Sequence, residues 1–132
     1  METLCIQPTG MAPPGGHYSH AVVAGGFVYV AGQLPITADG RKLSDAPFDD
    51  QARQVLANIE AAVLGAGSRL DHLVQVRVYL TRIDDWPAFN ALYAAWLGPH
   101  RPARAVVPVP VLHFGFLLEA EAVALCAPPD RP

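Results

Sequence analysis

The sequence predicts an α/β (α+β) fold with the element order β-β-α-β-α-β-β, in which two helices cover one face of a mixed sheet. Segments with strand-like alternation surround two segments whose apolar residues recur at helical spacing, and glycine or proline separates them. The 132 residues contain no internal repeat and no long linker. We therefore expect a single domain over residues 1–132, with tails at about 1–14 and 127–132.

The amino-terminal half begins with a predicted hairpin. Residues 21–23 and 27–31 are short apolar strands, and Ala24-Gly25-Gly26 joins them. Glycine permits the positive φ angles that a tight hairpin turn requires. A further short strand is possible at residues 4–6.

A first amphipathic helix is predicted from about Asp49. It has an acidic start, and either Gly65 or Gly67 ends it. Its apolar residues recur every three or four positions: Ala52, Val55, Leu56, Ile59, Val63 and Ala66.

Residues 73–81 alternate like a strand with one buried face, formed by Val74, Val76, Val78 and Leu80. A second helix follows, capped by Asp84 or Asp85, with Pro87 in its first turn and Gly98-Pro99 at its end. Its apolar stripe comprises Phe89, Leu92, Tyr93, Trp96 and Leu97.

Two β-rich segments, residues 103–112 and 116–125, complete the sheet. Pro108 and Pro110 lack backbone N–H groups on the same side of the first segment, which predicts an edge or irregular strand and puts Arg104 near a rim. Two helices cover only one sheet face. We expect a second copy of the chain to cover the other, because closed homo-oligomers are common.

Composition excludes several classes of protein. Hydrophobic residues make up 52% of the chain and charged residues only 16%, which excludes disorder and agrees with surface buried between copies. Residues 10–38 carry no Asp, Glu, Lys or Arg, but prolines, histidines and glycines interrupt them too often for a membrane span. The first basic residue is Arg41, which argues against a secretory signal or a transit peptide. A net charge of −3 gives no reason to bind nucleic acid.

The cysteines favour the cytoplasm. Cys5 and Cys126 are far apart and have apolar neighbours, so we expect two buried thiols in a reducing compartment.

The few charges of the last third are candidates for chemistry. Arg104 opens a strand, where its guanidinium could hold a small carboxylate or pair with an acid of its own fold. Glu119 and Glu121 share one strand face, so one of them is expected to be protonated, paired or active as a general acid or base. From the residues alone, a structural salt bridge is slightly favoured over catalysis.

Other kinds of site have no motif behind them. The five histidines show no metal-ligand spacing, and the glycines form neither a dinucleotide fingerprint nor a P-loop. We therefore expect no metal and no cofactor. His17 and His20 could line a pocket beside Tyr18, although loop histidines are more often solvated.

Five segments, in order and in register, resemble the RidA (YjgF-like) reactive intermediate deaminase family. They are Gly-His-Tyr-Ser-His-Ala (16–21), Val-Ala-Gly-Gln-Leu-Pro (30–35), Gln-Ala-Arg-Gln-Val-Leu-Ala-Asn-Ile (51–59), Pro-Ala-Arg-Ala-Val-Val (102–107) and Glu-Ala-Glu-Ala-Val-Ala (119–124). The resemblance implies a chorismate-mutase-like fold and a homotrimer with an inner β-barrel and three clefts between subunits. It also implies hydrolysis of enamines and imines, such as 2-aminoacrylate, to 2-keto acids and ammonia.

The resemblance assigns roles to residues of this chain. Arg104 matches the arginine that binds the substrate carboxylate, and Glu119 the glutamate that positions the attacking water. The implied substrate-binding positions are Tyr18, Ala31, Gly32, Trp86, Asn90 and Val106.

Three departures from the family pattern bear on the substrate. Ala31 stands where deaminases usually carry serine, His20 replaces a common glutamine, and His113-Phe114-Gly115 replaces a polar turn. The alternatives are a carboxylate-binding or regulatory trimer without catalysis, and an enzyme for a larger imine. The ribonuclease activity attributed to some relatives fits poorly with the acidic pI of about 5.9.

Overall fold

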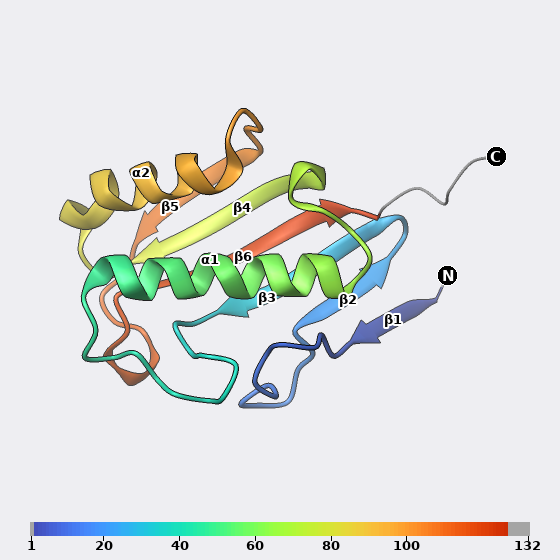
Figure 1. Cartoon of the computed structure of the whole chain (residues 1–132), viewed down its shortest axis with the longest axis horizontal. Coiled ribbons are helices and arrows are strands. Elements are labelled where there is room, and N and C mark those ends of the chain that lie inside the picture. The colour runs from blue at the N-terminus through green and yellow to red at the C-terminus, as the bar shows by residue number, and fades with distance from the viewer. Residues whose placement is uncertain (1, 127–132) are drawn as a thin grey trace.

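The structure, a computed structural model, describes residues 2–126, so the tail predicted at 127–132 lies outside the described residues. Both helices lie on one face of a six-stranded sheet whose order is β1-β2-β3-β6-β4-β5 (Figure 1). Neighbouring strands are antiparallel except β4 and β5, which are parallel. The elements are β1 (Thr3–Ile6), β2 (Ala21–Ala24), β3 (Phe27–Gln33), α1 (Phe48–Gly65), β4 (Leu73–Leu80), α2 (Trp86–Leu97), β5 (Ala103–Pro108) and β6 (Leu118–Leu125), with 3-10 turns at Leu70–His72, Ile83–Asp85 and His113–Gly115.

The mixed α+β fold predicted from the sequence is confirmed. Gly25 and Gly26 have φ angles of 56° and 85°, and this pair of positive values makes the tight turn between β2 and β3. The short strand expected at residues 4–6 is β1, an edge strand inside the segment of about 1–14 that resembled a tail.

The helix boundaries also follow the sequence. Helix α1 ends at Gly65, with Gly67 in the left-handed region at φ 82°, and Gly98 ends α2. Asp85 occupies the N-cap of α2, but its side chain makes no capping hydrogen bond and pairs with Arg82 at 3.0 Å. None of the helices within residues 2–126 is long and apolar enough to span a membrane.

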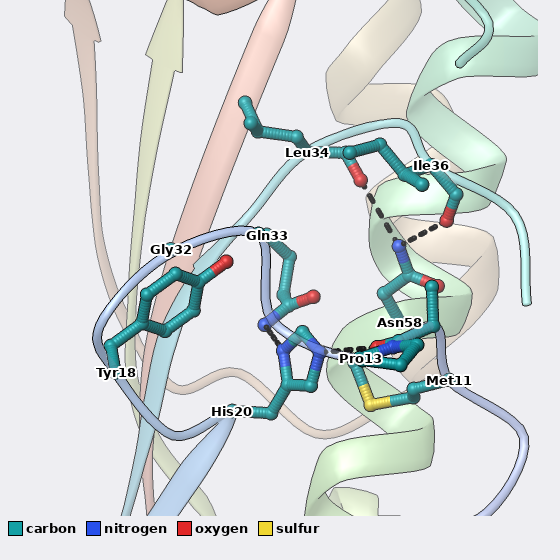
Figure 2. A pocket seen from close by; sticks show the side chains of 11 residues that line it. Met11, Pro13, Tyr18, His20, Gly32, Gln33, Leu34, Ile36 and Asn58 are labelled. Atoms are coloured by element: carbon teal, nitrogen blue, oxygen red, sulfur yellow. Dashed lines mark hydrogen bonds between the residues drawn. The ribbon is translucent and has the colours of Figure 1, made fainter. Parts of the chain in front are cut away.

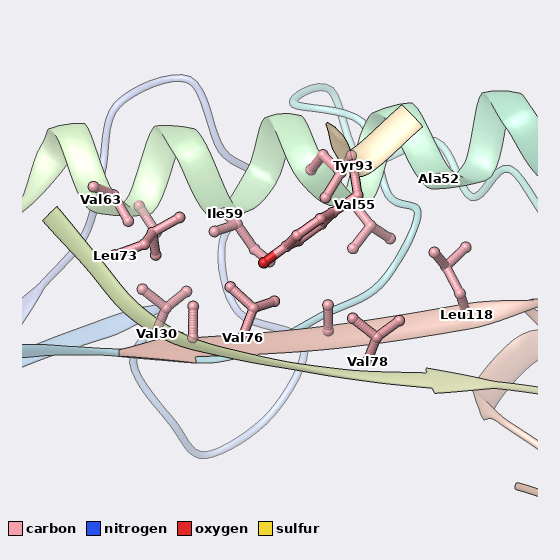
Figure 3. Packing of buried hydrophobic residues seen from close by; sticks show 14 of the residues in the cluster. Val30, Ala52, Val55, Ile59, Val63, Leu73, Val76, Val78, Tyr93 and Leu118 are labelled. Atoms are coloured by element: carbon pink, nitrogen blue, oxygen red, sulfur yellow. The ribbon is translucent and has the colours of Figure 1, made fainter. Parts of the chain in front are cut away.

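The hydrophobic core fills the space between the helices and the sheet (Figure 3). Val55, Ile59 and Val63 project from α1 onto Val76 and Val78 of β4. The β6 residues below them are the alternating Leu118, Ala120, Ala122 and Ala124, all at most 4% exposed. This packing fixes which face of β6 is left for polar side chains.

One residue of β4 was placed on the wrong face by the sequence pattern. Val74 was predicted to be buried, but it is 40% exposed, while Leu73 is 2% exposed. The pairing of β4 with β6 shifts between Leu73 and Gln75, and the extra residue of this irregularity turns Val74 away from the core.

Within residues 2–126, no layer covers the sheet face opposite the helices. Strand β5 is an edge strand, as predicted, but it ends at Pro108, so Pro110 lies beyond it. Large apolar side chains on the uncovered face, among them Phe27, Tyr29 and Val107, are 36–48% exposed. The expectation of two buried thiols is wrong: Cys5 is exposed in the edge strand β1, and Cys126, just after the end of β6, is partly exposed although it packs against the core.

Candidate functional site

The two β6 carboxylates share the uncovered face, but their surroundings differ. The Tyr79 hydroxyl donates a hydrogen bond of 2.7 Å to Glu121 Oε1, and Arg77 Nη1 lies 3.8 Å from the same oxygen. This hydrogen bond raises the pKa of Tyr79. Of the two glutamates, Glu121 is therefore the one that forms a structural pair. The sequence alone did not show which of the two is paired.

Glu119 has neither an ion pair nor a side-chain hydrogen bond to any residue that the structure describes. It is half-buried, and this burial is the main cause that raises its pKa; repulsion from Glu121 adds to it, and His113 lowers it slightly. A partly desolvated carboxylate with a raised pKa is the type of group that exchanges protons with a substrate.

A cleft of about 540 Å³ contains Glu119. Tyr18, Ala31 and Gly32 line one side of it, and His113 and Phe114 contribute another part of the wall. Three of the binding positions expected from the family resemblance thus lie in one cleft with the expected catalytic glutamate.

Gly32 brings the main chain against the Glu119 carboxylate. The pairing of β3 with β6 shifts between Val30 and Gln33, so Ala31 and Gly32 form a bulge. A Cβ atom at residue 32 would overlap the Glu119 side chain. A larger residue at position 32 would therefore displace the Glu119 carboxylate from its place in the cleft.

His20 and Gln33 form a buried pair that lines a second, smaller pocket, which shares Tyr18 and Gly32 with the Glu119 cleft (Figure 2). Gln33 Nε2 lies 3.1 Å from His20 Nδ1, and His20 Nε2 lies 2.7 Å from the Ala12 carbonyl oxygen. The amide nitrogen can only donate, so Nδ1 accepts and the neutral ring donates from Nε2 to Ala12. This pair ties the loop before β2, which carries Tyr18, to the strand that carries Gly32.

Arg104 lies in a different pocket, of about 440 Å³, on the helix side of the sheet. Its Nη1 donates a hydrogen bond of 2.9 Å to Asn90 Oδ1. The guanidinium carbon lies 4.9 Å from the Tyr93 ring centroid and 5.7 Å from that of Trp86. These contacts leave the guanidinium without an acidic partner among the described residues.

Arg104 and Glu119 point to opposite faces of the sheet. Arg104 is paired with Val76, whose side chain is fully buried under the helices, whereas Glu119 is paired with Tyr79 on the uncovered face. Val106 follows Arg104 on the helix side. The structure thus groups the expected site residues into two sets: Tyr18, Ala31, Gly32 and Glu119 in one, and Trp86, Asn90, Arg104 and Val106 in the other.

Several residues at this site had little or no signal in the sequence. His20 was expected either to line a pocket or to be solvated; it is buried and lines a pocket, but its partner Gln33, thirteen positions away, had no signal in the sequence. Phe114 was visible only as part of an unusual turn. Tyr93 was assigned to the core stripe of α2, and it also supports Arg104 with its ring; burial raises its pKa to about 12.

Sequence comparisons identify related proteins over nearly the whole chain. A family profile described as Endoribonuclease L-PSP matches residues 9–126. A RutC family protein of Pyrococcus horikoshii is 40% identical over 111 residues, which are 84% of this chain and 88% of that protein. A 2-iminobutanoate/2-iminopropanoate deaminase of Dermatophagoides farinae is 31% identical over 121 residues, covering 91% and 94% of the two chains.

Solved structures share the fold. The crystal structure of yeast Mmf1 superimposes with a TM-score of 0.91 at 32% identity, over 96% of this chain and 100% of that one. The structure of Escherichia coli TdcF with bound serine gives a TM-score of 0.87 at 29% identity, over 94% and 99%.

Proposed function

Since this chain belongs to the Endoribonuclease L-PSP (YjgF/RidA) family, we propose that it is a hydrolytic deaminase of reactive enamines and imines. Its substrates are 2-imino acids of the 2-aminoacrylate type, and its products are 2-keto acids and ammonia. The observation that carries the proposal is Glu119, a half-buried carboxylate with a raised pKa beside Gly32 in an open cleft. The deaminase of Dermatophagoides farinae supports the reaction class.

The reaction needs one proton carrier and no cofactor. Water adds to C2 of the protonated imine while Glu119 accepts a proton from the water, and the C=N electron pair moves to nitrogen, which gives a neutral carbinolamine. Glu119 returns this proton to the amino nitrogen. Its carboxylate then accepts the hydroxyl proton as the oxygen forms the C=O bond and the C–N bond breaks, and that proton leaves on the released ammonia as ammonium. General acid–base catalysis of this kind contributes about 10²–10⁴-fold to a rate.

Arg104 is proposed to bind the substrate carboxylate. The guanidinium can donate two parallel hydrogen bonds to a carboxylate, and the ring contacts and the bond to Asn90 hold it in place. A bound carboxylate fixes C2 relative to the water, which lowers the entropic part of the barrier.

A complete site is proposed to form between copies of the chain. Arg104 and Glu119 lie on opposite sheet faces of one chain. We therefore propose that Arg104 of one copy and Glu119 of another copy form one cleft. A homotrimer with three sheets around an inner barrel would cover the exposed Phe27, Tyr29 and Val107 and create three such clefts. The proposed partners are thus an imino acid substrate and two further copies of the chain. We propose no nucleic-acid partner and no membrane partner, and we propose that the protein acts in the cytoplasm.

The test is a coupled assay in which an amino-acid oxidase or a threonine dehydratase supplies the imine. Wild-type protein should speed imine loss beyond the spontaneous rate, and Arg104→Ala or Glu119→Gln should remove the acceleration. No acceleration by wild type, or full activity of Arg104→Ala, would exclude the deaminase.

Mixing the two inactive variants tests the shared site. After joint unfolding and refolding at equal amounts, roughly a quarter of the clefts should contain both an intact Arg104 and an intact Glu119. Each variant refolded alone is the control. Failure of the mixture to regain activity would contradict a site built from two copies.

A second candidate is a carboxylate-binding trimer without turnover. Two observations favour it: Ala31 provides no hydroxyl in the cleft, and TdcF is crystallised with bound serine. Stabilisation by 2-keto acids in a thermal-shift assay, together with no acceleration of imine loss, would identify this case.

A further inference from the structure

The wall of the Glu119 cleft is largely apolar. Leu34, Ile36 and Phe114 line it together with the Tyr18 ring. A volume of about 540 Å³ is in the range of sites for much larger molecules than a three-carbon imino acid. An imino acid whose side chain is a single methyl group would make little contact with these four side chains, which are the apolar part of the wall that one chain supplies.

Phe114 has an unusual backbone conformation for an aromatic residue. Its φ and ψ are 57° and 18°, in the left-handed region, and it is the one non-glycine residue with positive φ within residues 2–126. Side chains other than glycine, asparagine and aspartate adopt this region at a cost of about 1–3 kcal/mol. A bulky residue keeps this backbone conformation only when contacts with its neighbours hold it in place.

Three neighbours hold the Phe114 ring although the residue is 55% exposed. The Phe116 ring packs edge-on at 5.7 Å between centroids, and the His113 ring lies at 5.4 Å. Lys42 Nζ lies 4.8 Å from the centroid. The turn thus presents a preformed aromatic wall to the cleft instead of burying the ring in the core.

We propose that Phe114 is a specificity-determining residue that selects 2-imino acids with bulky apolar side chains, such as those derived from leucine or phenylalanine. The proposal rests on the deaminase function above. Because Glu119 and Phe114 line the same cleft, a substrate whose C2 atom lies at Glu119 has its side chain within the apolar walls. A large apolar group then loses its contact with water at a surface that is already formed.

The experiment uses one oxidase to generate two imines, from D-alanine and from D-phenylalanine, so that only the side chain differs. The wild type should hydrolyse the phenylalanine-derived imine with a kcat/KM at least about tenfold above that of the alanine-derived imine. Phe114→Asn removes the ring while tolerating the left-handed backbone, and it should lower this ratio about tenfold.

Two further variants serve as controls. Phe114→Leu keeps an apolar side chain and should retain most of the preference. Leu64→Ala removes an exposed leucine from α1, outside the lining of the cleft, and should leave the ratio unchanged. Phe114→Gly, which relaxes the backbone, replaces Phe114→Asn where that variant is poorly folded by circular dichroism.

The outcomes separate this inference from the proposed function. Acceleration of both imines with the same ratio in wild type and Phe114→Asn would overturn the role of Phe114 and leave the deaminase intact. No acceleration of either imine would overturn the deaminase. A thermal-shift measurement of binding then tests the role of Phe114. If phenylpyruvate stabilises the wild type more than pyruvate does, and Phe114→Asn loses this difference, the apolar site is supported. Equal stabilisation by the two keto acids contradicts it.

Discussion

Replacement of Glu119 by glutamine is expected to abolish turnover and to stabilise the protein at neutral pH. Glu119 and Glu121 are two positions apart on one strand face, about 6.6 Å along the chain. At that distance the repulsion of two carboxylates is roughly 0.6 to 2.5 kcal/mol for effective dielectric constants of about 80 to 20, and solvent screening favours the lower part of this range. Glutamine keeps the shape of the side chain and removes the charge.

The expected gain in stability is about 1 kcal/mol, or about 3–5 °C in Tm, together with a loss of activity of at least about 10²-fold. Its pH dependence follows from the raised pKa of Glu119. The folded state binds the Glu119 proton more tightly than the unfolded state does. Wild-type stability is therefore lost as the pH rises from the ordinary value of 4.5 through the raised pKa. The difference between variant and wild type should be near zero below about pH 4 and largest at pH 7.

Urea unfolding at pH 4 and pH 7, with the imine assay at pH 7, measures both effects. Glu121→Gln is the matched control. It removes a carboxylate charge from the same face of β6, two residues from Glu119, and it disrupts the ion pair with Arg77. That variant should lose less than about 1 kcal/mol of stability. A Glu119→Gln protein that is less stable than wild type at pH 7 would refute the reasoning, because it would mean that Glu119 is held ionised by a partner.

Three other substitutions test parts of the fold and the cleft. Gly32→Ala should lower turnover at least tenfold with an unchanged circular dichroism spectrum, because the new methyl group displaces the Glu119 carboxylate; unchanged turnover would contradict the close approach. Gln51→Leu should cost about 2–4 kcal/mol in urea unfolding, because the buried amide accepts from the Leu117 N–H and donates to two backbone carbonyls; a loss below about 1 kcal/mol would contradict this role. Tyr93→Phe should raise the free energy of unfolding by about 1 kcal/mol, because the hydroxyl is buried without a partner among the described residues, and a measured destabilisation would reveal a hydrogen bond to it.

The fold was predictable because its local signals agree with each other. Glycine at positions 25 and 26 determined the hairpin, the period of α1 determined its buried face, and the two prolines placed β5 at an edge. Val74 was misassigned because alternation assumes a regular ladder, and an irregularity in β4 depends on its pairing with β6 rather than on its own residues.

Candidate site residues could be named from the sequence, but their arrangement in space could not. The final third of the chain has few charges, and this indicated Arg104, Glu119 and Glu121 as candidates. What distinguishes the two glutamates is the hydrogen bond that Glu121 accepts from Tyr79, which is forty-two positions away in the sequence. The side of the sheet that Arg104 takes follows from its parallel register with Val76. Contacts between distant segments of this kind leave no periodic signal in the sequence.

If each cleft draws Arg104 and Glu119 from two copies, as proposed, their placement on opposite sheet faces would make specific activity a function of protein concentration. An isolated chain would then be inactive however well it is folded, and dilution below the dissociation constant of the assembly would switch the activity off by mass action. A cell that made both intact chains and chains lacking Glu119 would lose clefts through mixed assemblies, and the defective chains would act as dominant inhibitors of the intact ones.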